Sequence, residues 1–158
     1  MSAVAALALT GWSGWSYARA ASEEDLAYGK ARDTVLEQGS AHVARLNSID
    51  GTQVREGLRE WRAAATGPLL DELRRTGERS GKVLQQDGTS TRATVTEAAV
   101  TALDTRAGTA TLIAALRVEA TPRGGEATTD RKRFEAGLAR TADGWKIDAL
   151  TALPVGAP

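Results

Sequence analysis

A strict two-residue alternation in the C-terminal half of the chain most strongly constrains the fold. Between residues 109 and 121 every second position on one side is apolar: Ala110, Leu112, Ala114, Leu116 and Val118. Successive side chains of a β-strand point to opposite faces, so this pattern predicts a strand with one buried face. Residues 129–141 repeat it, with Phe134, Ala136 and Leu138 on one side. The two segments therefore predict antiparallel neighbours that share one apolar face.

Two further strands flank this pair. Asp143-Gly144 is a strong hairpin turn, and Trp145 and Ile147 continue the alternation after it. Residues 89–104 predict a long strand whose parity slips near residues 97–99, where a β-bulge would bend it. The C-terminal part of the chain is thus expected to form four consecutive antiparallel strands.

The preceding residues follow helical spacing in three segments. The apolar positions are, in the first segment, Tyr28, Ala31, Val35, His42 and Leu46; in the second, Val54, Leu58, Trp61 and Ala65; in the third, Leu69, Leu70, Leu73, Val83 and Leu84. Asp50-Gly51-Thr52 separates the first two, and Pro68 suits the first turn of the third, which Gly77 and Gly81 are expected to weaken. Helices followed by strands predict an α+β fold, with three helices packed on a curved four-stranded antiparallel sheet.

The first twenty residues do not fit that domain. Residues 2–18 carry no charge and as a helix would span about 26 Å, at the short end of what crosses a bilayer core of roughly 30 Å. Trp12, Trp15 and Tyr17 gather beside Arg19, as residues at a membrane interface do. We expect a membrane anchor over residues 1–20, truncated if Met1 is not the true start.

Two other interpretations of this segment stay open. Ala18-Arg19-Ala20 loosely resembles the cleavage site of an export signal, although no basic residues precede the apolar run. A first helix of a soluble core is the third interpretation. On the anchor hypothesis, residues 21–153 form a single extracytoplasmic domain and residues 154–158 form a flexible tail.

Composition excludes several kinds of chemistry. The chain has no cysteine and one histidine, so thiol catalysis and a transition-metal site are not expected. Twenty basic and twenty acidic side chains balance, which argues against nucleic acid as a partner. No phosphate-binding glycine-rich loop or catalytic serine motif is present. We expect neither catalytic residues nor a cofactor.

Four residues and one basic run are ambiguous. His42, Trp61, Phe134 and Trp145 could line a pocket between helices and sheet, but core packing is the alternative. The densest basic run, residues 131–133, lies on a predicted strand, whose alternation prevents all three charges from facing one way. This run is either a solvated strand end or a patch for an anionic ligand or partner.

The order of these elements and the residue composition of several stretches resemble those of a known family. The relevant stretches are Leu46-Asn47-Ser48-Ile49-Asp50, the Ala65-Thr66-Gly67 break, the strands at 92–103 and 108–118, and Asp143-Gly144-Trp145-Lys146-Ile147. With the apolar first segment, they are similar to the mammalian-cell-entry-associated membrane proteins of actinobacteria. No invariant reactive motif carries this resemblance.

The resemblance implies a single-pass protein of the cell membrane whose C-terminal domain is extracytoplasmic and has a cystatin-like or nuclear-transport-factor-like cone. It further implies a non-catalytic accessory protein that stabilises a lipid or sterol import complex of mammalian-cell-entry proteins. A domain that holds a lipid or sterol in its cone is the alternative. Enzymes of this fold, such as ketosteroid isomerases and dehydratases, use Asp, Tyr or His inside the cone. This chain has no Tyr or His after its first predicted helix.

Overall fold

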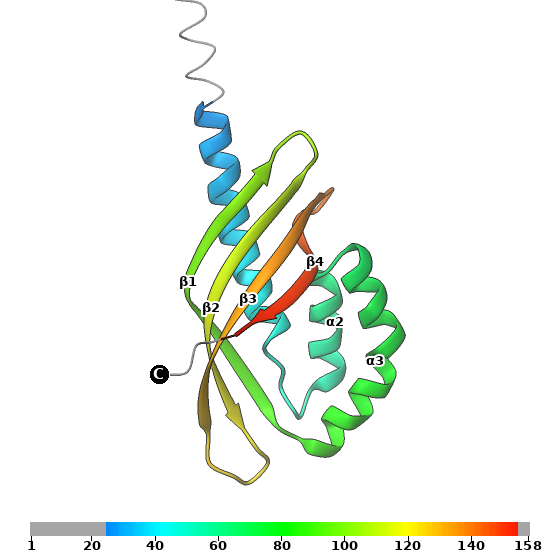
Figure 1. Ribbon diagram of the computed structural model, residues 1–158. Helices are drawn as coiled ribbons and strands as arrows, with labels where there is room; N and C mark the ends of the chain where they lie inside the picture. The colour runs from blue at the N-terminus through cyan, green and yellow to red at the C-terminus, as the bar shows by residue number, and fades with distance from the viewer. Residues whose placement is uncertain (1–24, 155–158) are drawn as a thin grey trace, which may run out of the picture. The chain divides into compact units, whose positions relative to one another are not determined.

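The computed structural model describes residues 25–154 (Figure 1). A helix over residues 25–46, called the N-terminal helix below, precedes two helices and four strands. These are α2 (Val54–Ala64), α3 (Gly67–Asp87), β1 (Ser90–Asp104), β2 (Thr109–Thr121), β3 (Thr128–Thr141) and β4 (Gly144–Leu153). The α+β order of three helices and four antiparallel strands confirms the prediction.

The chain divides into two units between Asp33 and Thr34, and the sheet with α2 and α3 belongs to the second unit. The anchor predicted at residues 1–20, with Trp12, Trp15, Tyr17 and Arg19, lies outside the described residues. Within residues 25–154, no helix has both the length and the apolar content needed to cross a bilayer.

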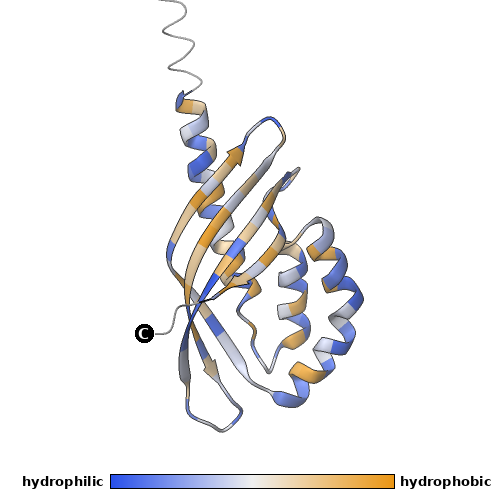
Figure 2. Cartoon of the chain, viewed as in Figure 1, coloured by the Kyte–Doolittle hydropathy of each residue, from blue (hydrophilic) through white to orange (hydrophobic). Residues whose placement is uncertain are grey.

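The sheet is an antiparallel meander in the order β1-β2-β3-β4. The alternation seen in β2 sets which face is buried: Leu112, Ala114 and Leu116 are at most 2% exposed. Their partners on β3 share this inner face, as where Leu112 lies opposite Ala136. Figure 2 shows hydrophobic colour concentrated on the sheet, whereas α3 is largely hydrophilic.

The part of the N-terminal helix that belongs to the second unit, residues 34–46, packs on the inner face. Val35 and Val43 are fully buried in the main core cluster, together with Leu112, Leu138 and Ile147. Gly39 lies between them, and a Cβ atom there would be 3.0 Å from Cδ2 of Leu138. The missing side chain therefore lets the helix approach the sheet closely.

The irregularity predicted in β1 is confirmed, and it consists of two β-bulges. The register against β2 shifts between Val95 and Glu97 and again between Val100 and Ala102. The residue skipped at each shift is a threonine. The hydroxyl of Thr96 donates to the backbone oxygen of Ala115, and that of Thr101 donates to the oxygen of Thr111. The bulged residues thus stay bonded to β2 through their side chains.

Two glycines of α3 have a different role from the one expected. Gly77 and Gly81 are the buried residues of this helix. A Cβ atom at Gly81 would be 2.9 Å from Cδ1 of Leu58 on α2, so the glycines form the surface against which α2 packs. Val83, expected to be buried, is 59% exposed because the face set by the glycines continues through Leu84 instead.

Single bridges tie the ends of the α2 segment to both sheet edges. Ile49 exchanges backbone hydrogen bonds of 2.8 and 2.9 Å with Thr91 on β1. At the other end, Ala65 forms a parallel bridge with Ile147 on β4, and the Thr66 N–H donates to the Ile147 oxygen at 2.8 Å. The outward edges of β1 and β4 are therefore each paired at one position.

Candidate interaction site

His42, one of the four residues considered for a pocket and the one histidine of the chain, lies near two cations. It is half-buried, and its Nδ1 has no hydrogen-bond partner among the described residues. Burial lowers its pKa most and the charge of Arg45 lowers it further, while the Trp145 backbone acts in the opposite direction and the charge of Lys146 adds to the lowering. The imidazole is therefore neutral at pH 7 and faces cations rather than the carboxylate that a catalytic pair would need.

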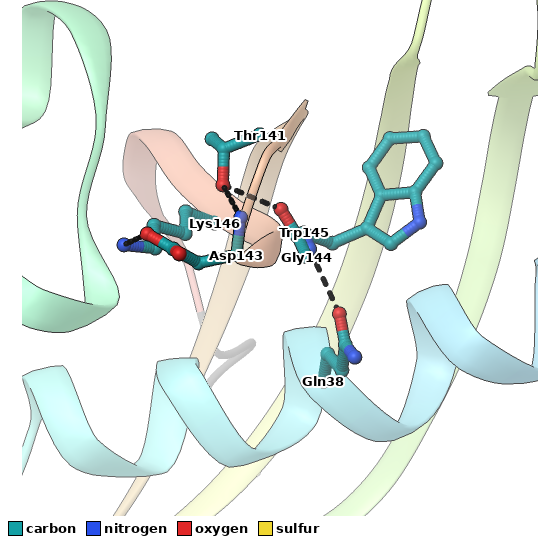
Figure 3. A network of polar contacts seen from close by, with 6 residues as sticks. All are labelled: Gln38, Thr141, Asp143, Gly144, Trp145 and Lys146. Carbon is teal, nitrogen blue, oxygen red and sulfur yellow. Dashed lines mark hydrogen bonds and ion pairs between the residues drawn. The ribbon is translucent and has the colours of Figure 1, made fainter.

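The hairpin between β3 and β4 is fixed to the N-terminal helix by a hydrogen bond from Trp145 to Gln38 (Figure 3). The amide oxygen of Gln38 accepts the backbone N–H of Trp145 at 2.8 Å. Within the turn, the Thr141 hydroxyl donates to the Gly144 oxygen at 2.8 Å. Gly144 has a φ of +104°, a conformation available mainly to glycine, which is why the Asp143-Gly144 turn was predictable.

The four residues considered for a pocket divide between two clusters. Trp145 is 5% exposed in the main core, and Phe134 packs against the same cluster. Trp61 packs instead on the smaller cluster of Ile49, Val54 and Leu58. Its Nε1–H donates to the backbone oxygen of Ser48 at 2.8 Å. His42, Trp61, Phe134 and Trp145 are absent from the linings of both pockets described here, so a pocket built from them stays a prediction.

The larger of these pockets, called the acidic groove below, has a volume of about 590 Å³. It lies between α2 and the paired ends of β1 and β2. Its charged lining residues are Asp50, Glu56, Glu60, Glu119 and Arg92. These residues come from three distant segments of the chain, so no local sequence motif predicted the groove. The smaller pocket, of about 470 Å³, shares Gln53 and Glu56 with it.

Asp50 helps to shape one end of the groove. Its Oδ1 accepts hydrogen bonds from the backbone N–H and the hydroxyl of Thr52, at 2.8 and 2.7 Å. These bonds hold its pKa below the ordinary value. They also form the turn from which α2 begins, as expected from the Asp50-Gly51-Thr52 break.

A second charged feature lies on the outer sheet face and is called the arginine cluster below. Arg117 lies directly opposite Arg131, and Arg133 lies opposite Ala115, two residues from Arg117 on the same strand face. All three arginines are exposed. Lys132 points to the other face, so the basic run has the alternation expected, but β2 supplies a third charge that inspection of the run alone missed.

No group of metal-binding side chains occurs within the part of the chain described. A scan of family models and a search of curated proteins both found no match to this chain. Membership of the mammalian-cell-entry-associated family therefore stays a prediction.

Solved structures do share the fold. An IcmL-like type IV secretion system protein from Legionella pneumophila is 12% identical, with a TM-score of 0.65 over 80% of this chain and 95% of that one. The periplasmic domain of DotI is 12% identical, with a TM-score of 0.63 over 77% and 94%. A candidate aromatic ring hydroxylase from Novosphingobium aromaticivorans is 17% identical, with a TM-score of 0.54 over 77% and 93%.

These likenesses define the class. The domain is an α+β protein of the nuclear-transport-factor-like fold. Identities this low establish the fold alone, and the fold serves both secretion proteins and an enzyme candidate, so function must be argued from the site.

Proposed function

We propose that this chain is a non-catalytic accessory domain, tethered to the membrane, that holds together a protein complex of the cell envelope. The supporting observation is that the inner sheet face is filled by the chain's own side chains. Leu112, Leu116 and Leu138 are each at most 2% exposed. A lipid in the cone would have to displace them, whereas the acidic groove and the arginine cluster are open to a protein partner.

Location and partner form the finer part of the proposal. A membrane anchor at residues 1–20 would leave the domain on the extracytoplasmic side, and the structural neighbour DotI contributes a periplasmic domain. The sequence resemblance favours a mammalian-cell-entry-type lipid or sterol importer as the complex. The neighbour from Legionella pneumophila belongs to a type IV secretion system, which makes a secretion complex the competing possibility.

Affinity purification from membranes tests the proposal. The full chain, tagged at its C-terminus, is extracted in mild detergent and its companions are identified by mass spectrometry. We expect importer subunits to be enriched over a tag-only control, and their steady-state levels to fall when the chain is deleted. Secretion components in their place would redirect the proposal. Unchanged importer levels and unchanged lipid uptake in the deletion strain would overturn it.

A further inference from the structure

We infer that two copies of this chain pair through the end of the sheet that carries both charged features, with the arginine cluster of each copy lying against the acidic groove of the other. This inference concerns contacts between copies of this chain, so it does not depend on which envelope complex the chain joins.

The arginine cluster is the first observation. Like charges directly opposite each other on a sheet are destabilising, yet Arg117 faces Arg131 and Arg133 lies beside them. Within residues 25–154 none of the ion pairs involves these arginines, although Glu119 and Glu135 are each two residues from one of them on the same strand. A guanidinium group binds a carboxylate in a planar, two-bonded geometry, so the cluster is suited to carboxylates from outside.

The acidic groove is the second observation, and it adjoins the cluster. Glu119 lines the groove and follows Arg117 by two residues, so both side chains lie on the outer face of β2. The groove is lined by four carboxylates and one guanidinium, Arg92, while the cluster contains three guanidinium groups. Glu56 also pairs with the exposed Arg59, which lies outside the lining. The two neighbouring surfaces therefore carry formal charge of opposite sign.

The spacing of the charges also matches. Glu56 and Glu60 are four residues apart on α2, which places them about 6 Å apart along the helix. Arg131 and Arg133 are two residues apart on β3, which places them about 7 Å apart along the strand. Two carboxylates of one copy can thus meet two guanidinium groups of another in register, with Glu56 exchanging its exposed intrachain partner Arg59 for an arginine of the second copy.

The groove adjoins the cluster at Glu119, so opposite charges lie side by side at this end of the sheet, and such a surface is complementary to itself under a two-fold rotation. Each cluster then meets a groove, both contacts form at once, and the assembly closes as a dimer. A partner of one charge would neutralise either the arginine cluster or the acidic groove, whereas a second copy neutralises both. The occupant with the required chemistry is therefore the chain itself.

Charge reversal is the first test. The full chain in mild detergent is studied by sedimentation velocity as wild type, as a groove-reversed variant (Glu56→Arg with Glu60→Arg) and as a cluster-reversed variant (Arg131→Glu with Arg133→Glu). Each reversed variant should be monomeric, and an equimolar mixture of the two should recover a heterodimer. Matched controls on α3, Glu78→Arg with Asp87→Arg and Arg79→Glu with Lys82→Glu, should dimerise as the wild type does.

Salt gives an independent measure. The screening length falls from about 10 Å at 0.1 M to about 3 Å at 1 M salt, so the wild-type dimer should weaken about tenfold or more over this range. A wild-type chain that is monomeric at low salt overturns the inference. Reversed variants that still dimerise, or a mixture that stays monomeric although circular dichroism shows both variants folded, overturn it as well.

Cross-linking tests the geometry in membranes. Because the chain has no cysteine, Glu60→Cys and Arg131→Cys can be introduced into two differently tagged copies. Mild oxidation should form a disulfide between the cysteine at position 60 of one copy and the cysteine at position 131 of the other. The product is a covalent dimer that carries both tags. Replacing the second change by Arg79→Cys should abolish the link, and equal linking of both combinations would count against the proposed arrangement.

Discussion

The side-chain oxygen of Gln38 accepts the backbone N–H of Trp145 at 2.8 Å, across 107 residues of sequence. This bond joins the N-terminal helix to the final hairpin just where Trp145 enters the core. A Cβ atom on Gly144 would lie 2.8 Å from the same oxygen, so glycine at the turn also makes room for the contact.

Replacing Gln38 with Ala should lower the free energy of unfolding by about 1–3 kcal/mol, because the partly buried N–H of Trp145 would lose its acceptor. Urea denaturation followed by tryptophan fluorescence measures the change. Gln38→Glu keeps an acceptor oxygen and should lose less. Glu37→Ala, at the exposed neighbouring position, should stay within about 0.5 kcal/mol of the wild type. Equal effects of Gln38→Ala and Glu37→Ala would refute the assigned role.

The same glycine-to-alanine change should have opposite effects at two positions. At Gly51 a Cβ atom would lie 2.5 Å from the backbone oxygen of Gly88, and backbone atoms cannot move aside cheaply. Gly51→Ala should therefore destabilise the domain by about 1–3 kcal/mol or more. Gly29 has open space around its Cβ position within the N-terminal helix, so Gly29→Ala should be neutral or stabilising by up to about 1 kcal/mol. Denaturation midpoints that shift in the same direction would contradict this prediction.

Stability should fall in mild acid because of His42. Its pKa in the folded chain is below the ordinary 6.5 owing to burial and then to Arg45 and Lys146. Above pH 6.5 both folded and unfolded chains hold a neutral imidazole. As pH falls below this value, the unfolded chain binds a proton first, so the free energy of unfolding decreases until the pH passes the folded pKa.

The His42→Gln variant should show a smaller loss of stability between about pH 8 and pH 5, the range in which histidine titrates. Since the chain has one histidine, the difference between the two curves isolates this residue. Asp50 and Asp104 have lowered pKa values and titrate at lower pH, so they add little in this range. Parallel curves for wild type and variant would show that His42 does not couple to folding.

The bulged threonines should matter more than their exposure suggests. Thr101→Val removes the hydroxyl that donates to the Thr111 oxygen, and the expected cost is about 0.5–1.5 kcal/mol. Thr94→Val changes an exposed residue of the same strand and serves as the matched control. Hydrogen exchange of the β1 and β2 amides should also accelerate in Thr101→Val but not in the control.

Local pattern explains why much of the fold was predictable. The inward residues of β2, the Asp143-Gly144 turn and the break before α2 each follow from a few neighbouring residues. The first bulge of β1 was visible as a slip in the alternation of side chains, although the second bulge was not. These features depend on side-chain alternation and backbone freedom, which the sequence displays directly.

Contacts between distant segments account for what was missed. Gly77 and Gly81 looked like weaknesses of a helix, because only the packed structure reveals that α2 needs their missing side chains. The arginine cluster depends on the register of β2 against β3, and the acidic groove depends on three separate segments. Neither the register of two strands nor the contact between segments far apart in the chain can be predicted from a short stretch of sequence.

The bridges at Ile49 and Ala65 give α2 a mechanical role. They fasten the two ends of one short segment to strands at opposite sides of the sheet, so this segment acts as a brace across it (Figure 1). A rigid helix resists changes in length, and the spread of the sheet is therefore coupled to the number of turns in α2. A load on the groove wall formed by α2 would therefore reach β1 through the bridge at Ile49 and β4 through the bridge at Ala65.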